Sequence, residues 1–352
     1  MKKHLTIFLL ILSLLLSGCV IVVEPAESAP AQVSGDGLTV HFIDVGQADC
    51  ALLECGGEYM IIDGGNKEDG QLVISYLQQQ GVEELSAVVC THAHEDHVGG
   101  LPSVLAVYPT GAVYAPTRTY ASNVFDDFLY YTDQQRLEVT IPQPGDAFLL
   151  GEAQVTVLGP VQSYAETNDT SIILRVDYGE NSFLFTGDME VAAENDMLDF
   201  WDRSGNAAIL DVDVLKVGHH GSDTSTGYRF LNAVMPEYAV ISVGEGNSYG
   251  HPHDEPLSRL EDAGVTQFRT DRLGTVVAAA DGTEITFTWT VTASSPACAE
   301  PGEAIVYIGN RNSMKFHAPD CASLPSEKNR VEFDSYDAAT DAGYAPCGSC
   351  LG

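Results

Sequence analysis

The stretch Thr91-His92-Ala93-His94-Glu95-Asp96-His97-Val98-Gly99-Gly100 decides the interpretation of the whole chain, because four potential metal ligands lie within six positions. These ligands are His92, His94, Asp96 and His97. Residues 85–90 predict a short buried strand and residues 101–108 a helix, so the ligands lie on a loop between them. Two imidazoles at His-x-His spacing can face the same way, whereas the adjacent Asp96 and His97 point apart, so one loop can serve two metal ions. A solvated histidine-rich loop is the alternative, but such loops seldom follow a buried strand and end in Gly-Gly.

The composition is that of a globular protein. With 352 residues, 45% of them apolar and 19% charged, the chain can form one large domain and a small one. Its net charge of -34 repels polyanions at long range, which argues against a broad, basic nucleic-acid-binding surface. Metal ions could still create a local cationic site. The composition leaves the oligomeric state open.

The N-terminus predicts export and membrane attachment. Residues 1–18 have two basic residues followed by an apolar run, Leu5 to Leu16, that is short for a membrane span. The ending Leu16-Ser17-Gly18-Cys19 resembles the lipobox of bacterial lipoproteins, which implies cleavage before Cys19 and lipidation of its thiol. The protein would then be extracytoplasmic and lipid-anchored; a plain signal peptide or an uncleaved anchor is the alternative. Residues 19–37 predict a flexible tether, because they are rich in Pro, Ala and Ser.

Residues 38–292 predict alternating strands and helices with hairpins, which is an α/β pattern. Acidic and histidine residues recur where apolar strands end. Beyond the first ligand loop they are Asp63, Asp188, His219, His220, His251 and His253. Such strand ends share one rim of a sheet, where sites are commonly built. Thr224 or Ser225 is expected to cap the helix that ends near Met235.

Together these segments resemble the metallo-β-lactamase fold, in particular the subgroup that includes the extracellular hydrolase domain of ComEC-type DNA-uptake proteins. Seven motifs carry the resemblance. In chain order they are Asp44-Val45-Gly46-Gln47-Ala48-Asp49, Ile62-Asp63-Gly64-Gly65, residues 92–100, Asn168-Asp169-Thr170-Ser171, Phe185-Thr186-Gly187-Asp188, residues 215–222 and Tyr249-Gly250-His251-Pro252. The resemblance implies an αββα sandwich with a two-metal site at one edge.

The resemblance also implies a role for each ligand. His92 and His94 would bind the first metal ion, and Asp96 and His97 the second. Asp188 would bridge the two ions. Asp188 and Asp96 are the predicted catalytic residues, since Asp188 joins the ions and Asp96 could steer a proton.

The remaining ligands are less directly assigned. The family usually supplies a further histidine to the first metal ion from the region where this chain has Asn168-Asp169. The His-His-Gly-Ser segment of the ComEC-like subgroup fills that role, which gives His219 to the first metal ion, with His220 as its alternative. His251 is then assigned to the second metal ion, with His253 as its alternative.

Three aspartates are predicted to support the ligands from behind. Asp63 matches the acidic residue that usually supports the ligand loop, a role that orients imidazoles. Asp44 and Asp169 either do the same or serve as turn and capping groups.

The predicted activity follows from the metal site. Imidazole-rich ligation favours zinc, with manganese as the alternative where carboxylates contribute. Two divalent ions suit the hydrolysis of a phosphodiester or an ester. The prediction is an extracytoplasmic binuclear hydrolase acting on phosphodiesters such as DNA or a phosphorylated wall polymer. The alternatives are an envelope- or DNA-binding lipoprotein with an idle sandwich, and a hydrolase of lactones, thioesters or β-lactams, because one scaffold hosts many chemistries.

The C-terminal part predicts a second, structural metal site. Residues 293–303 read as a linker and residues 304–352 as a small domain. The four residues of its closed zinc site would be His317, Cys321, Cys347 and Cys350. A domain of about fifty residues gains stability from such a site. The segment resembles the zinc-binding modules related to the Ada repair protein; a disulfide among its cysteines is the alternative.

Overall fold

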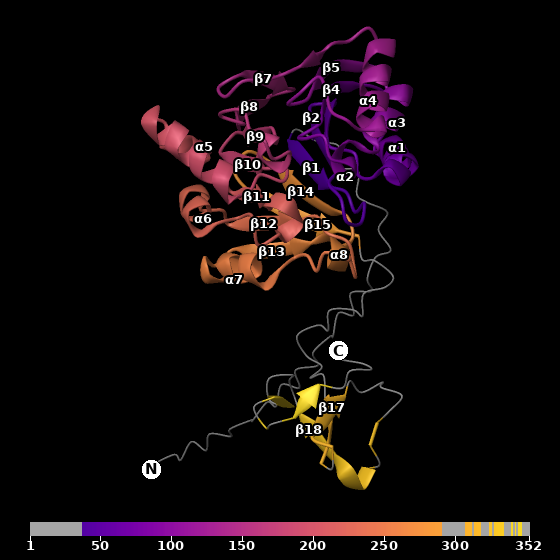
Figure 1. The fold of residues 1–352 in the computed structure, drawn as a ribbon, viewed down its shortest axis with the longest axis vertical. Coiled ribbons are helices and arrows are strands. Elements are labelled where there is room, and N and C mark those ends of the chain that lie inside the picture. Colours follow the sequence, from indigo (N-terminus) through magenta and orange to yellow (C-terminus); the bar gives the residue numbers. More distant parts are fainter. Residues whose placement is uncertain are drawn as a thin grey trace, which may run out of the picture.

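The computed structural model describes residues 37–290 and, near the C-terminus, residues 307–311, 313–317, 324–325, 327–333, 339–340, 342 and 344–346. Residues 37–290 form two β-sheets that pack face to face, with helices on the outer face of each sheet (Figure 1). The predicted αββα sandwich is therefore confirmed.

The first sheet has eight strands. Their spatial order is β15 (Ile285–Trp289), β14 (Val276–Ala280), β1 (Leu38–Phe42), β2 (Ala51–Cys55), β3 (Glu58–Ile62), β4 (Leu85–Val89), β5 (Thr110–Tyr114) and β6 (Val139–Thr140). Pairing is antiparallel from β15 to β3 and parallel from β3 to β6.

The second sheet has seven strands. Their spatial order is β13 (Thr266–Arg269), β12 (Tyr238–Ile241), β11 (Val214–Lys216), β10 (Asn181–Phe185), β9 (Ile173–Tyr178), β8 (Ala153–Gly159) and β7 (Ala147–Leu150). Pairing is antiparallel from β7 to β10 and parallel from β10 to β13. Neighbouring parallel strands end at the same edge of their sheet, so the loops that follow them lie side by side.

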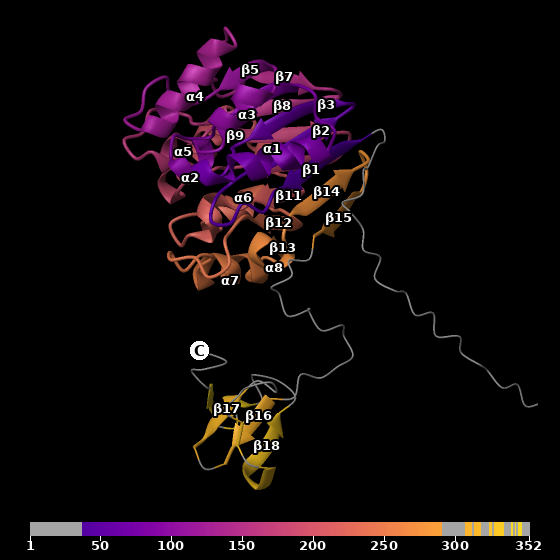
Figure 2. The ribbon, with the colours of Figure 1, turned by 90° about the vertical axis from the view of Figure 1, so that its right-hand side faces the viewer.

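Helices cover both sheets. Those packed on the first sheet are α1 (Gly70–Gln79), α2 (Glu95–Val98), α3 (Leu101–Val107) and α4 (Asn123–Gln134), and those on the second are α5 (Val191–Arg203), α6 (Tyr228–Val234) and α7 (Asp254–Asp262). In Figure 2, α1 and α3 lie over the strands of the eight-stranded sheet. The short elements are α8 (Thr270–Leu273), η1 (Lys67–Asp69), η2 (Asn168–Thr170), η3 (Ala207–Leu210) and η4 (Gly218–Gly221). No helix in the described part of the chain is long and apolar enough to span a bilayer.

The alternation of side chains along the strands creates three cores. Leu38, Val40 and Phe42 of β1 point between the sheets, where Phe42 stacks on Phe185 of the opposite sheet at 5.9 Å between ring centroids. Leu52 points the other way, into the core under α1 and α3. Because apolar residues are buried on both faces of each sheet, the strands are rigid supports for the loops at their ends.

One local prediction is wrong. Helix α6 begins after Gly227, so neither Thr224 nor Ser225 caps it. The Ser225 hydroxyl instead donates a hydrogen bond of 2.8 Å to the backbone oxygen of Met189. This bond ties the turn before α6 to the turn before α5.

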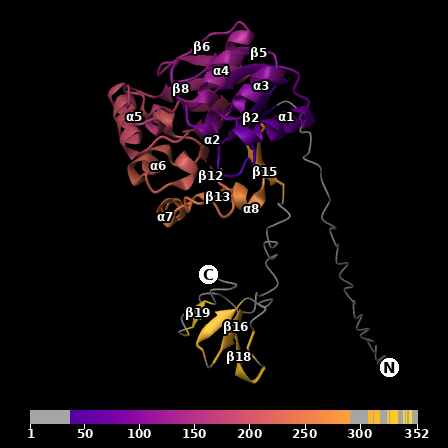
Figure 3. The same cartoon turned by 45° about the vertical axis from the view of Figure 1, so that its right-hand side comes forward.

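A separate four-stranded sheet lies in the C-terminal part (Figure 3). Its order is β18 (Arg330–Phe333), β16 (Tyr307–Asn310), β17 (Lys315–His317) and β19 (Ala345–Pro346), and η5 (Glu327–Asn329) precedes β18. His317 ends β17 and is buried. The predicted zinc ligands Cys321, Cys347 and Cys350 lie outside the described residues, as do Cys19 and the predicted linker, so these remain predictions.

Candidate metal centre

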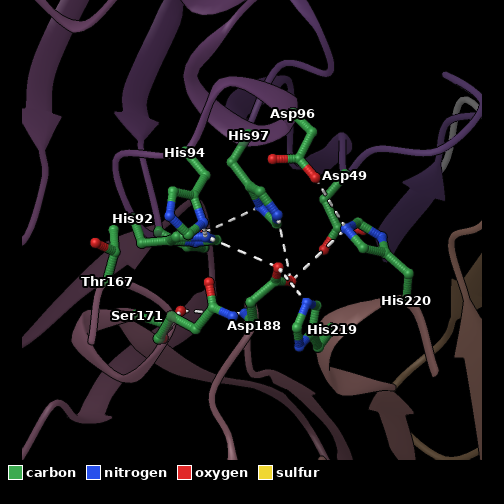
Figure 4. A network of polar contacts seen from close by, with 12 residues as sticks. Asp49, His92, His94, Asp96, His97, Thr167, Ser171, Asp188, His219 and His220 are labelled. Atoms are coloured by element: carbon green, nitrogen blue, oxygen red, sulfur yellow. Dashed lines mark hydrogen bonds and ion pairs between the residues drawn. The ribbon is translucent and has the colours of Figure 1, made fainter. Parts of the chain in front are cut away.

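Loops from both sheets bring the predicted ligands together at one edge of the sandwich. His92 and His94 follow β4, and the single-turn helix α2 carries Asp96 and His97. Asp188 follows β10. Figure 4 shows the Asp188 carboxylate at the centre of a ring of imidazoles.

The Gly-Gly end of the first loop allows this arrangement. A Cβ on Gly99 would lie 2.4 Å from the backbone oxygen of Glu95 and 2.4 Å from the backbone nitrogen of Lys67. Only glycine permits so close an approach, so α2 can pack directly against the turn that follows β3.

Asp188 stands between two groups of imidazoles and is only 2% exposed. Its Oδ2 lies 3.8 Å from His92 Nε2 and 3.7 Å from His219 Nε2. Its Oδ1 lies 3.2 Å from His97 Nε2 and 3.8 Å from His220 Nε2. Burial opposes ionisation of this carboxyl, but the imidazoles of His97 and His220 hold its pKa well below the usual range. One carboxylate thus faces two separate sets of ligands.

The first group consists of His92, His94, His219 and the Oδ2 of Asp188. His92 Nε2 lies 3.1 Å from His94 Nδ1. The other nitrogen of His219, Nδ1, lies 3.2 Å from the Thr224 hydroxyl and 3.3 Å from a Glu190 carboxylate oxygen, so its Nε2 is left for the centre.

The second group consists of Asp96, His97, His220 and the Oδ1 of Asp188. One ligand atom from each of these four residues lies within 4.8 Å of the others. His220 Nε2 lies 3.4 Å from Asp96 Oδ2. Asp96 and His97, which were predicted to share one ion, lie together in this group, and His220, which was predicted as the alternative to His219 for the first metal ion, lies here as well.

Unpartnered buried atoms indicate what these groups could hold. Within the described residues, His97 Nε2, Asp188 Oδ1 and His220 Nε2 are fully buried and form no hydrogen bond. Leaving such atoms without a partner is costly, and native proteins rarely do so. Zinc binds nitrogen and oxygen ligands at about 2.0–2.2 Å, so two ligands of one ion commonly lie about 3–4 Å apart. The three unpartnered atoms all belong to the second group, which therefore fits one divalent cation. In the first group, separations of 3.1 Å between His92 and His94 and of 3.7 and 3.8 Å to Asp188 Oδ2 fit another cation on the other side of Asp188.

Asp63 fixes the direction of His97. Its Oδ2 lies 2.8 Å from His97 Nδ1, and its carboxylate also accepts hydrogen bonds from the Thr91 backbone N–H at 2.7 Å and from the Thr91 hydroxyl at 2.6 Å. In the neutral imidazole Nδ1 then carries the proton, and Nε2 presents its lone pair to the centre. This is the supporting position predicted for Asp63.

A buried ion pair behind the second group was missed by the sequence reasoning. Lys216 Nζ lies 2.8 Å from Asp49 Oδ2, and both side chains are nearly inaccessible. Asp49 Oδ1 lies 3.2 Å from His220 Nδ1, which is also 3.0 Å from the Ser242 backbone oxygen, so the His220 proton is on Nδ1. Burial alone would raise the pKa of Asp49, but Lys216 and His220 outweigh it and hold that pKa below the usual range. A lysine within the otherwise apolar run of residues 214–217 was the available signal.

The backbone of η4 explains why two adjacent histidines serve different groups. His219 and His220 both have left-handed conformations, with φ of 51° and 53°. Such conformations are uncommon for residues with a side chain and are typical of functional sites. They send one imidazole to each oxygen of Asp188.

His251 lies elsewhere than predicted. The geometry places His220, and not His251, in the second group. His251 lines the cavity in front of the centre, and its Nδ1 lies 3.3 Å from Gln47 Nε2. His253 Nδ1 accepts a hydrogen bond from the Asp223 backbone at 3.0 Å.

Asp44 and Asp169 were predicted either to support the metal ligands or to serve as turn and capping groups. In the structure both accept backbone hydrogen bonds within loops. Asp44 Oδ1 accepts a hydrogen bond from the Gly46 backbone at 3.2 Å. Asp169 Oδ1 accepts one from the Glu190 backbone at 3.1 Å. These contacts shape the loops and do not involve a candidate ligand.

A cavity of about 530 Å³ opens in front of the centre. Besides candidate ligands, its walls contain Gln47, Asn66, Glu95, Asn168, Tyr249 and His251. Among these described lining residues there is no lysine or arginine, so any cationic attraction within the cavity comes from the centre itself.

Comparison with known proteins identifies the class. A profile described as the Metallo-beta-lactamase superfamily matches residues 43–245, more than half of the chain. The chain therefore belongs to this superfamily and has its hydrolase fold, with residues that could bind a metal ion.

Relatives narrow the class further. The chain is 28% identical over 256 residues to ComE operon protein 3 of Bacillus subtilis, covering 67% of this chain and 32% of that protein. It is 30% identical over 247 residues to Competence protein ComA of Neisseria gonorrhoeae, covering 70% and 33%. It is also similar to Recombination protein 2 of Haemophilus influenzae, with 32% identity over 236 residues, covering 65% and 27%.

These relatives confirm the predicted resemblance to competence-protein hydrolase domains, although the chain spans only about a third of their length. Among solved structures, the metallo-beta-lactamase fold protein YhfI from Bacillus subtilis matches with a TM-score of 0.47 and 13% identity, covering 69% of this chain and 100% of that one. The lipoprotein signal and the Ada-like module stay predictions.

Proposed function

We propose that this chain hydrolyses phosphodiesters with two divalent cations, for which zinc is favoured and manganese is the alternative. The observation that carries the proposal is the buried Asp188 carboxylate, whose two oxygens face two separate groups of ligands. A shared carboxylate between two cations is suited to displacement at phosphorus, because one cation can serve each side of the reacting centre.

The residues divide into two sets. His92, His94 and His219 would hold the first cation with Asp188. The set for the second cation is Asp96, His97 and His220, again with Asp188. When bound, the cations would supply an activated water and would neutralise charge that develops on the phosphoryl oxygens.

The remaining chemistry belongs to the side chains. Asp96 lines the cavity, and its side chain is 33% exposed, so it is placed to receive a proton from water. Asp63 and the Ser242 backbone oxygen keep the imidazoles of His97 and His220 in the tautomer that offers Nε2. Since neither imidazole has to reorient, the ligand atoms are preorganised.

The charge of the cavity wall favours short or terminal phosphodiester substrates over extended polyanions. With a net charge of -34 on the chain and no lysine or arginine among the described residues of the wall, an extended polyanion gains little outside the centre. A phosphodiester at a strand end or in a short segment would need no such surface. DNA and a phosphorylated wall polymer both offer that group.

The proposal places the enzyme outside the cytoplasm, held to the membrane by lipid on Cys19, with a structural zinc bound by His317, Cys321, Cys347 and Cys350. Metabolic labelling with a radioactive fatty acid tests the anchor. Label should be incorporated into the wild-type protein and should be absent from a Cys19→Ala variant.

Activity is tested by metal analysis combined with hydrolysis of bis(p-nitrophenyl) phosphate by the purified protein. The expected result is two metal ions per chain at the centre and turnover that is lost in a His92→Ala/His94→Ala variant. Equal metal content without turnover of any diester would favour the idle-scaffold alternative. Preferential turnover of a thioester, lactone or β-lactam would replace the phosphodiester assignment.

A further inference from the structure

The loop after β12 holds the His251 imidazole firmly at the cavity. Asn247 Oδ1 accepts a hydrogen bond from the His251 backbone N–H at 3.0 Å, and Asn247 Nδ2 donates one to the His251 backbone oxygen at 2.6 Å. The Tyr249 ring stacks on the imidazole at 5.7 Å between centroids and 26° between planes. The loop thus fixes the backbone of His251 and places an aromatic ring against its imidazole.

Gln47 determines which nitrogen of His251 carries the proton. The Gly244 backbone N–H donates to Gln47 Oε1 at 3.2 Å, which fixes the orientation of the amide. The amide Nε2 therefore faces His251 Nδ1, at 3.3 Å. Because an amide NH₂ can only donate, Nδ1 of a neutral imidazole must accept, and the ring proton lies on Nε2.

The approach of the two loops depends on glycine. A Cβ on Gly244 would lie 2.6 Å from the Gln47 backbone nitrogen. No larger residue could bring this N–H so close without displacing the loop that carries Gln47. Two segments about 200 positions apart therefore act together on one imidazole.

The position of His251 separates it from the ligand groups. The four imidazoles of His92, His97, His219 and His220 each place a nitrogen within 3.8 Å of an Asp188 oxygen. Among the described residues, His251 places no ring nitrogen that close to Asp188. Its ring lies 5.5 Å from that of His219, between centroids, and it lines the cavity. Since Nδ1 faces Gln47, Nε2 is the nitrogen left for a molecule in the cavity.

We propose that His251 binds no metal ion and instead donates its Nε2–H to an oxygen of the substrate, and that Gln47 is the positioning residue that fixes this tautomer. The proposal rests on the proposed function, since it assumes a phosphoryl oxygen in the cavity. It adds a neutral donor to a cavity wall that has no lysine or arginine among its described lining residues. A neutral N–H donor can stabilise a phosphoryl oxygen of the substrate by a hydrogen bond. Because it carries no charge, it does not repel the two cations.

Two substitutions, His251→Gln and His251→Asn, distinguish a hydrogen-bond donor from a metal ligand at this position. The amide nitrogen of Gln reaches approximately the place of Nε2, so His251→Gln keeps a donor toward the cavity. In His251→Asn the amide reaches only the place of Nδ1, so the donor is lost. Both variants should keep two zinc ions at the centre by metal analysis, because His251 is not a ligand. Loss of one zinc ion from His251→Asn would overturn the proposal.

The probe for the donor is inorganic phosphate, titrated into the zinc-loaded protein by calorimetry. His251→Asn should weaken phosphate binding about tenfold, the effect expected of one hydrogen bond to a charged group, and His251→Gln should weaken it less. Equal binding by wild type and His251→Asn would contradict the proposal. The same ordering is expected for kcat/KM on bis(p-nitrophenyl) phosphate.

The tautomer is tested directly by nitrogen NMR of histidine-labelled, zinc-loaded protein. The His251 signals, identified by their disappearance in His251→Gln, should show a protonated Nε2 and an unprotonated Nδ1. In Gln47→Met, which keeps the side-chain length but has no donor, the two tautomers should exchange. A proton on Nδ1 in the wild type would overturn the proposal. If the protein neither binds phosphate nor cleaves diesters, the proposed function fails, while the NMR and metal measurements still decide whether His251 is a neutral non-ligand donor.

Discussion

Replacing Lys216 by Met should destabilise both the fold and the second cation site. Lys216 Nζ and Asp49 Oδ2 are 2.8 Å apart, with side-chain exposures of 5% and 7%. At an effective dielectric constant of about 20, two charges at that distance attract by about 6 kcal/mol, which offsets the cost of burying both. Methionine fills a similar volume but leaves the Asp49 carboxylate buried without its cation.

The expected loss of folding free energy depends on the contacts that Asp49 keeps in the Lys216→Met variant. Removing one partner of a buried pair commonly costs about 3–5 kcal/mol, and the remaining contact between Asp49 and His220 Nδ1 at 3.2 Å favours the lower end, about 3 kcal/mol. Because the Asp49 carboxylate lies 3.2 Å from His220 Nδ1, disturbing Asp49 should also lower the affinity for the second zinc ion, by about 10–100-fold.

The assay is urea unfolding of the metal-free protein under reducing conditions, followed by competitive zinc titration. The control is the double variant Asp49→Asn/Lys216→Met, which removes both charges and should be more stable than Lys216→Met alone. The reasoning would be refuted by a Lys216→Met protein within 0.5 kcal/mol of wild type, or by a double variant less stable than the single one.

Two further predictions concern Glu194 and Asp63. Burial raises the pKa of Glu194 to about 7, although backbone N–H groups of Gly227 and Thr226 partly lower it. The folded state therefore binds more protons than the unfolded state between about pH 4.5 and 7, so the free energy of unfolding should fall as the pH rises through that window. Relative to Glu194→Gln, the fall from pH 5 to pH 8 should be about 2.5 kcal/mol in chemical unfolding; a parallel pH dependence of the two proteins would contradict the assignment. Asp63→Asn should lower zinc affinity and diester turnover by about 10–100-fold, because the amide no longer holds the His97 proton on Nδ1; unchanged zinc affinity in competitive titration would speak against that role.

Much of the metal centre could be predicted from the sequence, because most of its ligands lie close together in the chain or just after an apolar strand. The loop from His92 to His97 combines four ligands with a preceding apolar strand, and Asp188 follows another apolar strand directly. Each such strand is buried on both faces, so its end is fixed by packing, and motif spacing translates into position. Asp63 could be placed for the same reason.

The rest could not be predicted because it depends on the tertiary structure. His219 faces one group of ligands and His220 the other because both have left-handed backbone conformations, which cannot be recognised from the residue types. The Lys216–Asp49 pair joins positions 167 residues apart, and the sequence around each residue gives no indication of its partner. The same is true of His251, whose role depends on an amide brought in from the other end of the domain.

The account depends on a cation on each side of Asp188, and X-ray anomalous scattering from zinc-soaked crystals tests this most directly. Two peaks are expected at the centre, one against His92, His94 and His219 and the other against Asp96, His97 and His220, about 3.5–4 Å apart. A single peak, or a second peak coordinated by His251 in place of His220, would contradict it.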